Sequence, residues 1–268
     1  MQARGLATGT VLEGKTPTMP SELAASHAGN GPPHKLAGNH LLDGLPSSEL
    51  DAMRPSLERV RPRMRQVLFE QWEPIQYAYF PQGGVFSLLA QMQDRGTVET
   101  LTVGSEGMIG LHALLGARQS PTRAICQVSG WALRVPITTL IEAAPRNGVL
   151  FDRLMRYAQA RLTALSRSVA CNRLHSAQQR YARWVLTTQD RVGTDEFPIT
   201  QDFLAQMLGV TRPTISLVGQ ELQSLQLIHY AQGRLTVDDR EGLERVACEC
   251  YRTTRQAFAE LLGVERGG

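Results

Sequence analysis

The sequence predicts an α+β protein with an N-terminal antiparallel β-roll, one long helix and a C-terminal winged helix-turn-helix. Three patterns carry this prediction. Residues 201–225 show two short helical patterns separated by a glycine, and residues 66–136 show short apolar runs separated by turn residues. Residues 149–172 show a helical pattern with no interior Gly or Pro. We therefore expect two folded domains joined by the long helix.

Residues 199–209 predict the first helix of the helix-turn-helix. Apolar residues from Phe203 to Leu208 are spaced three and four positions apart, and Thr200 is placed as the N-cap. The helix should end at Gly209, because glycine takes the left-handed conformation at least cost. Small Ala205 is expected where the two helices cross.

The second helix should begin at Thr211, a second N-cap, with Pro213 in the first turn where its missing N–H costs nothing. An apolar stripe then continues through Ile215, Val218, Leu222 and Leu225. The alternative is an ordinary helical hairpin in a core, which would not require a capping Thr, a small Ala and a turn Gly together. Residues 227–230 and 235–237 read as two strands around a glycine turn, which adds a wing.

Composition bounds the class of protein. Of 268 residues, 42% are apolar and 20% are charged, and no run of roughly eighteen apolar residues could cross a bilayer. No secretory signal is recognised, so we expect a cytoplasmic protein. The four cysteines, Cys126, Cys171, Cys248 and Cys250, are too few for a disulfide framework and are expected to be reduced.

Charge gives only partial support for a nucleic-acid partner. The net charge is +3, and residues 201–240 carry three arginines against four carboxylates, whereas DNA-binding surfaces are usually basic. Residues 146–191 compensate, with nine arginines against Asp152 and Asp190.

The first residues are expected to form a disordered tail, residues 1–38, because they are rich in Gly, Pro, Ser and Thr without apolar periodicity. Residues 9–16 fit the phosphate-loop pattern G-x-x-x-x-G-K-T, with Lys15 in the lysine position. Such a loop needs a strand before it and a helix after it, and Pro17 and Pro20 stand where the helix should run. We therefore do not expect nucleotide hydrolysis.

The long helix carries an apolar stripe that is either core packed on the roll or a dimer seam. We favour the seam, because a two-fold protein matches a two-fold operator. Its residues are Leu154, Ala158, Leu162, Leu165 and Val169. A further helix is expected over residues 174–188, and residues 190–197 read as a loop. Residues 241–262 read as one terminal helix, which would place Cys248 and Cys250 on different faces and disfavour a metal site.

Two segments, N-R-L-H-S-A-Q-Q-R-Y-A-R-W-V-L at 172–186 and I-T-Q-D-F-L-A-Q-M-L-G-V-T-R-P-T-I-S at 199–216, resemble the CRP/FNR family of bacterial transcription regulators. The resemblance covers roughly residues 39–262. It implies a homodimer with a cyclic-nucleotide-binding-like roll (39–145), a dimerisation helix (146–172) and a DNA-binding domain (173–268). It also implies double-stranded DNA with a palindromic operator as partner, RNA polymerase as a further candidate partner, and no enzymatic activity.

Carried over position by position, Thr200, Thr211 and Thr214 resemble phosphate contacts. The base-facing positions hold Arg212, Pro213, Ser216 and Leu217. Arg212 can donate two hydrogen bonds to a guanine. Well-known members have an acidic residue in place of Pro213 and an arginine in place of Leu217, so the operator should differ from theirs. Gln220 and Arg234 complete the candidate DNA-contact set.

The candidate effector pocket departs further from the family. It comprises Gly110, Leu111, His112 and Arg123, and Leu111 stands where nucleotide-binding members have a carboxylate. No cysteine precedes Cys126, unlike the iron-sulfur members. We therefore predict no cofactor and no metal, with an unknown effector. His112 reads either as a haem or metal ligand or, more simply, as a core histidine.

Two other functions are weighed against DNA binding. The protein could be a small-molecule sensor that acts through protein contacts without specific DNA binding. It could also be an enzyme built on the roll, but no paired carboxylates or activated nucleophile support this.

Overall fold

The structure is a computed structural model that describes residues 38–93 and 96–263. Residues 1–37, including the phosphate-loop-like segment 9–16, lie outside the described residues. All described residues belong to one unit, Lys35–Gly268. None of the described helices is both long enough and apolar enough to cross a membrane.

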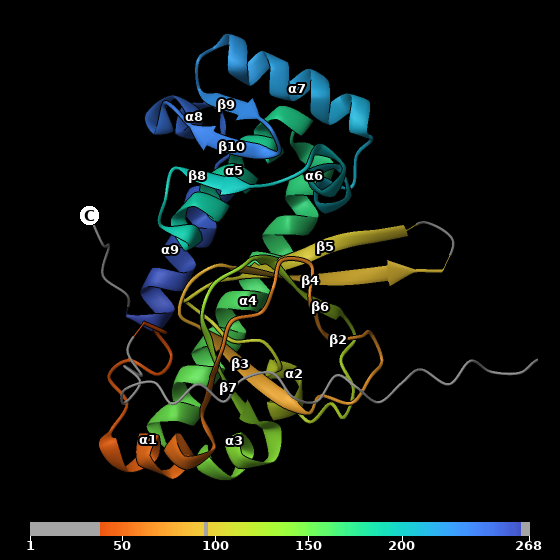
Figure 1. Cartoon of the computed structure of the whole chain (residues 1–268). Coiled ribbons are helices and arrows are strands. Elements are labelled where there is room, and N and C mark those ends of the chain that lie inside the picture. The colour runs from red at the N-terminus through yellow and green to blue at the C-terminus, as the bar shows by residue number, and fades with distance from the viewer. Residues whose placement is uncertain (1–37, 94–95, 264–268) are drawn as a thin grey trace, which may run out of the picture. The chain divides into compact units, whose positions relative to one another are not determined.

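The N-terminal domain is an antiparallel roll of two sheets (Figure 1). One sheet has the order β1-β7-β3, formed by Glu58–Val60, Ala132–Pro136 and Tyr77–Pro81. The other has the order β2-β6-β4-β5, formed by Val67–Phe69, Arg123–Val128, Val85–Met92 and Gly96–Val103. The flanking helices are α1 (Ser47–Met53), η1 (Arg54–Ser56), α2 (Leu111–Leu114) and α3 (Ile137–Ala143).

Buried apolar side chains between the two sheets form the core of the roll, including Phe80, Phe86 and Leu88. Glycines allow the β3–β4 turn to approach the β6–β7 turn. A Cβ atom on Gly84 would lie 2.4 Å from the Val128 carbonyl oxygen, so only glycine fits there. The predicted roll is therefore built as the short strands and turn residues indicated.

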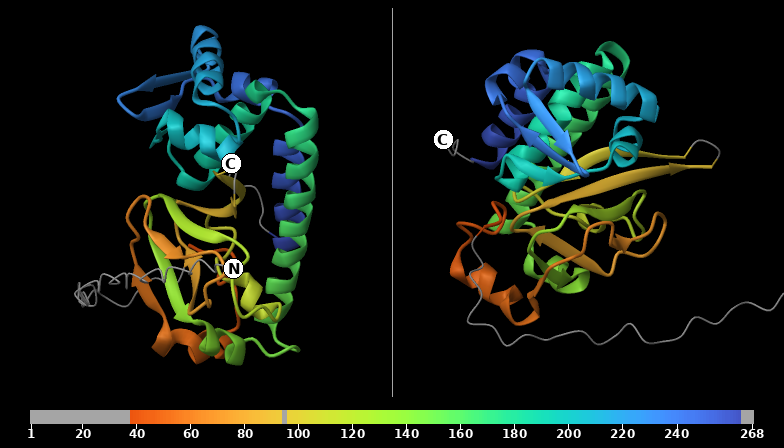
Figure 2. Two further views of the ribbon diagram at one scale, coloured as in Figure 1. Left: turned by 90° about the vertical axis from the view of Figure 1, so that its right-hand side faces the viewer. Right: turned by 45° about the horizontal axis from the view of Figure 1, so that its top comes forward.

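The long helix α4 (Val149–Leu174) runs along the roll and contributes to its core. The Tyr157 hydroxyl donates a hydrogen bond to the Met108 carbonyl oxygen at 3.1 Å, and Gly107 leaves room for the ring. The C-terminal helix α9 (Cys250–Leu262) packs lengthwise against α4 (Figures 1 and 2). One face of α4 is thus covered within the chain.

The C-terminal domain contains α5 (Ala177–Val192), α6 (Gln201–Leu208), α7 (Arg212–Ser224) and α8 (Arg240–Val246). Its sheet has the order β8-β10-β9, formed by Glu196–Pro198, Arg234–Val237 and Ile228–Ala231. Ser176 caps α5 with a capping box to Gln179, so this helix begins later than the predicted 174. Strand β8 lies where a loop was expected, because it pairs with the distant strand β10.

The predicted fold class is confirmed: an antiparallel roll, a long helix and a winged helix-turn-helix. Besides the missed strand β8, one predicted helix is wrong. The terminal helix expected over residues 241–262 is broken at residues 247–249 into α8 and α9, because Ala247 leaves the helical conformation with φ −64° and ψ 148°. The placement of Cys248 and Cys250 on helical faces was therefore mistaken.

Candidate nucleic-acid interface

The first helix of the helix-turn-helix is capped as predicted. The Thr200 hydroxyl accepts a hydrogen bond from the Phe203 backbone N–H at 3.2 Å, and α6 follows. Gly209 ends α6 with φ 63°, in the left-handed region that glycine favours. Arg180 of α5 donates a hydrogen bond to the Leu208 carbonyl oxygen at 3.1 Å. This bond gives a partner to a carbonyl group at the C-terminus of α6 and holds the end of α6 against α5.

The second helix, α7, has a buried face and an exposed face. Thr211 caps it by accepting a hydrogen bond from the Thr214 N–H at 3.4 Å. Ile215, Val218 and Leu222 are buried against the rest of the domain. The opposite face is exposed and carries Arg212, Pro213, Leu217 and Gln220. Leu217 is 58% exposed, so most of this apolar side chain is available for contact with a partner.

The crossing of α6 and α7 is tight, as expected. Ala205 is buried, and its carbonyl oxygen accepts a hydrogen bond from the Val210 N–H at 3.0 Å across the turn. Gly219 of α7 is also buried, on the side of α7 that faces Tyr181 of α5. The turn between the two helices is therefore closed by a backbone hydrogen bond beside the small, buried Ala205.

Both arginines among the candidate DNA contacts are paired with acids in the free protein. Arg212 of α7 lies 3.4 Å from Asp202 of α6, and both side chains are largely exposed. Arg234 of the wing pairs with Glu196 of β8. Exposed pairs of this kind are worth little and are screened by salt, so a phosphate or a base can replace either acid. The near-neutral helix-turn-helix is therefore compatible with binding a polyanion.

The remaining candidate contacts differ in how far they are exposed to solvent. Thr211 is exposed, and its hydroxyl lies 2.9 Å from that of Thr214. Ser216 is half-buried and donates a hydrogen bond to Gln201 at 2.8 Å, so it faces α6 more than solvent. The wing turn at Gln232 and Gly233 has φ of 50° and 75°, as in the tight hairpin turns that the sequence indicated.

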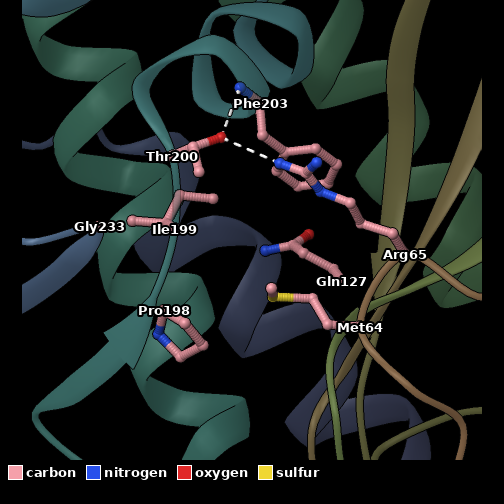
Figure 3. Close-up of a pocket in the computed structure, with 8 residues that line it drawn as sticks. All are labelled: Met64, Arg65, Gln127, Pro198, Ile199, Thr200, Phe203 and Gly233. Atoms are coloured by element: carbon pink, nitrogen blue, oxygen red, sulfur yellow. Dashed lines mark hydrogen bonds between the residues drawn. The ribbon is translucent and has the colours of Figure 1, made fainter.

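Thr200 lies beside a residue of the roll that sequence reasoning missed. The Arg65 guanidinium donates a hydrogen bond to the Thr200 hydroxyl at 3.4 Å (Figure 3). Arg65, Met64 and Gln127 of the roll face Phe203 and Thr200 across a small cavity. The sequence gives no signal for this contact, because residues 65 and 200 are far apart in the chain. The Arg65 guanidinium therefore occupies the hydroxyl of Thr200, which is one of the predicted phosphate contacts.

The candidate effector residues lie in different environments within the roll. Leu111 is 2% exposed, and its apolar side chain packs into the core of the roll. Arg123 pairs with Glu70 at 3.0 Å. Within the described residues, no hydrogen bond or ion pair joins Arg123 to His112.

His112 is half-buried on α2. Burial, with a smaller contribution from the positive charge of Arg161, lowers the pKa of His112 to about 4. The imidazole is therefore neutral at physiological pH. Arg161 of α4 is itself buried and lies above the Tyr157 ring, with 5.9 Å from the guanidinium carbon to the ring centroid.

The predicted seam residues divide between core and surface. Leu154 has 0% exposure and packs in the core of its own chain. Ala158 and Leu165 are half-buried against the same core. Leu162 is 59% exposed and Val169 is 73% exposed, on the part of α4 that α9 leaves uncovered. Only these two remain fully available to a second copy.

Two buried polar contacts join the roll to α5. Trp184 Nε1 donates a hydrogen bond to Glu99 Oε1 at 3.2 Å. Arg191 pairs with Glu106 at 2.7 Å, and the two side chains are only 10% and 17% exposed. These residues connect the roll to the helix that carries α6, and no local sequence motif pointed to them.

Comparisons with known proteins agree with this architecture. Residues 179–246 match the family model described as the Crp-like helix-turn-helix domain. The structure is similar to that of FixK2 from Bradyrhizobium japonicum, with 15% identity, a TM-score of 0.62, and coverage of 72% of this chain and 98% of that chain. It is also similar to a putative transcriptional regulator of the crp/fnr family from Eubacterium rectale ATCC 33656, with 15% identity, a TM-score of 0.61, and coverage of 77% and 96%.

A third similar structure is a CRP/FNR-family transcriptional regulator from Thermus thermophilus, with 21% identity, a TM-score of 0.58, and coverage of 71% and 98%. No curated protein matches the chain. The class that the fold and the site define is a winged helix-turn-helix protein with an N-terminal roll. Within that class, the chain contains a Crp-like helix-turn-helix domain and has the fold of the CRP/FNR transcription regulators, which confirms the predicted resemblance.

Proposed function

We propose that the protein is a sequence-specific DNA-binding transcription regulator that acts in the cytoplasm as a homodimer. The observation that carries the proposal is the exposed face of α7, where Arg212, Leu217 and Gln220 project from a helix whose other face is buried. A helix held in this way fits the major groove and presents base-reading side chains to it. The effector of the roll is unknown.

Arg212 is the principal specificity residue in this proposal. Its guanidinium can leave the weak pair with Asp202 and donate two hydrogen bonds to O6 and N7 of a guanine, worth about 1–3 kcal/mol of discrimination. Leu217 adds an apolar contact to a thymine methyl group. Thr211 and Thr214 fix the register by contacting phosphates. Thr200 joins them only when Arg65 moves away from its hydroxyl.

The dimer places two copies of α7 side by side. The exposed Leu162 and Val169 lie seven positions apart on α4, so they share one face of the helix, and burial of that face against a second copy would remove them from water. Two-fold symmetry then presents the α7 helices to half-sites about 34 Å apart in a palindromic operator. In this arrangement the roll (residues 39–145) is the sensor domain, and the long helix (residues 146–172) forms the dimer. The C-terminal domain (residues 173–268) binds DNA, and RNA polymerase is a further partner.

The test is selection of DNA sequences by the full chain, followed by gel retardation of the selected fragment. The expected result is a palindrome bound with a steep salt dependence. Arg212→Ala should lose sequence preference more than general affinity. Arg54→Ala is the matched control, because Arg54 is also an exposed arginine paired with an aspartate, Asp51, but lies on the roll.

Equal binding to all sequences by the intact protein would contradict the proposal. That result would favour the alternative, a sensor that uses the winged module for protein contacts.

A further inference from the structure

Three of the four cysteines and one histidine meet where α4 ends and α9 begins. Cys171 lies in the last turns of α4, and His175 is its C-cap residue. Cys248 and Cys250 lie at the break between α8 and α9. Their ligand atoms, three Sγ and one imidazole nitrogen, all lie within 4.8 Å of one another.

The break in the terminal helix creates this cluster. In a continuous helix Cys248 and Cys250 would point to different faces, but Cys248 here precedes α9 and its carbonyl oxygen accepts a hydrogen bond from the Tyr251 N–H at 3.1 Å. The chain turn brings both thiols to the same side. Packing of α9 along α4 then places them against Cys171, which is 77 positions away from Cys248 in the sequence.

The distances match those around a tetrahedral zinc ion. Zinc binds thiolate sulfur at about 2.3 Å and histidine nitrogen at about 2.0–2.1 Å, so tetrahedral ligands lie roughly 3.6–3.8 Å apart. Cys171 Sγ lies 3.5 Å from Cys248 Sγ, and Cys250 Sγ lies 3.7 Å from His175 Nδ1. The remaining pairs of ligand atoms lie within 4.8 Å, so movements of about 1 Å bring all four atoms around one ion, and this spacing leaves less room for a multi-iron cluster.

The histidine is oriented for metal binding. His175 Nε2 lies 3.2 Å from Glu249 Oε2, while Nδ1 faces the thiols. A histidine that donates one ring N–H to a carboxylate presents the other nitrogen as a lone pair, the arrangement found behind many zinc-bound histidines. This contact is independent of the cysteines and points to the same ligand.

Burial and charge are compatible with a closed structural site. Cys171, Cys248 and Cys250 are all buried, and the His175 side chain is only 15% exposed. Three thiolates and one Zn²⁺ carry a net negative charge, and Arg183 of α5 supplies a positive charge near Cys171. Zinc sites with four protein ligands and no open position are structural rather than catalytic.

We propose that Cys171, His175 Nδ1, Cys248 and Cys250 bind one Zn²⁺ ion. The ion ties the end of α4 to the start of α9, directly beside the hinge at which α5 begins at Ala177. It thereby fixes the angle at which the DNA-binding domain leaves the long helix. Metal binding itself does not depend on the proposed DNA-binding function.

The test measures metal in the full chain, purified under reducing conditions. Elemental analysis should find about one zinc per chain and no acid-labile sulfide. After removal of zinc by a chelator, Co²⁺ should give the visible ligand-field bands of a tetrahedral site and a thiolate-to-cobalt charge-transfer band. This measurement needs no variant and so does not depend on a variant folding.

We expect three variants, Cys171→Ser, Cys248→Ser and Cys250→Ser, to lower the zinc content of the purified chain. In the Co²⁺ form, each variant should show a charge-transfer band weaker by the contribution of one thiolate. Cys126→Ser is the matched control, because Cys126 is equally buried but lies in the roll, where it contacts the Pro62 carbonyl oxygen at 3.5 Å. It should keep its zinc. Glu249→Ala should weaken zinc affinity by about 10–100-fold.

Three results would overturn the proposal: no uptake of Zn²⁺ or Co²⁺ by the reduced intact chain, unchanged zinc in the three cysteine variants, or iron with acid-labile sulfide in place of zinc. Loss of zinc with unchanged operator binding would leave the site established and refute only its role at the hinge. Failure of DNA binding by zinc-loaded protein would bear on the proposed function and not on the site.

Discussion

Glu99 provides the sharpest test of the contact between the roll and α5. Its Oε1 accepts the hydrogen bond from Trp184, and its Oε2 is shielded from water. Burial raises the pKa of Glu99 to about 7, and hydrogen bonding by Ser87, the charge of Arg191 and the hydrogen bond from Trp184 offset this only in part. The folded chain therefore holds a proton on Glu99 that the unfolded chain releases near pH 4.5.

The sign of the pH dependence follows from this difference. Between pH 4.5 and about 7 the folded state binds more protons than the unfolded state, so the free energy of unfolding falls as the pH rises through this window. The change from 4.5 to about 7 corresponds to roughly 3 kcal/mol at most, at about 1.4 kcal/mol per pH unit. Local relaxation or water entry would reduce that figure.

Glu99→Gln keeps an amide oxygen for Trp184 but cannot ionise. We expect the variant to match the wild type near pH 4 and to be about 1–3 kcal/mol more stable near pH 8. The assay is urea unfolding across this range, followed by circular dichroism. Glu142→Gln, an exposed glutamate on α3, is the control. A stability difference between Glu99→Gln and wild type that does not change with pH would refute the reasoning.

Three further variants test other parts of the structure. Gly209→Ala places a Cβ on a residue with φ 63° and should cost about 1–2 kcal/mol in urea unfolding. Leu162→Asp combined with Val169→Asp should give monomers in analytical ultracentrifugation with unchanged helical content; persistent dimers would exclude this seam. Arg191→Met leaves Glu106 buried and unpaired and should cost about 3–5 kcal/mol in thermal unfolding, and a negligible shift would contradict a buried pair.

The helix-turn-helix could be predicted from the sequence because its determinants are local. Thr200 and Thr211 cap their own helices, and Gly209 takes a backbone conformation that few other residues adopt. Each of these requirements is met within a few positions along the chain. The same holds for the wing turn at Gln232 and Gly233.

What could not be predicted depends on packing between distant segments. Leu154 reads as one member of a stripe, yet the roll buries it and α9 covers the neighbouring face of α4. The cluster of Cys171 with Cys248 requires both this packing and the break after Val246. Periodicity indicates which face of a helix is apolar, but it does not say which neighbour covers that face.

The central claim is that α7 recognises specific DNA bases through Arg212 on its exposed face. The most direct measurement compares the affinity of the wild type and of Arg212→Ala for the selected operator and for operators in which one guanine at a time is replaced by 7-deazaguanine. The wild type should lose about 1 kcal/mol at one guanine in each half-site, because N7 accepts one of the two hydrogen bonds that together give about 1–3 kcal/mol, and Arg212→Ala should be indifferent to that replacement. If no guanine matters to the wild type, or if both proteins lose the same affinity, then α7 does not read DNA through Arg212.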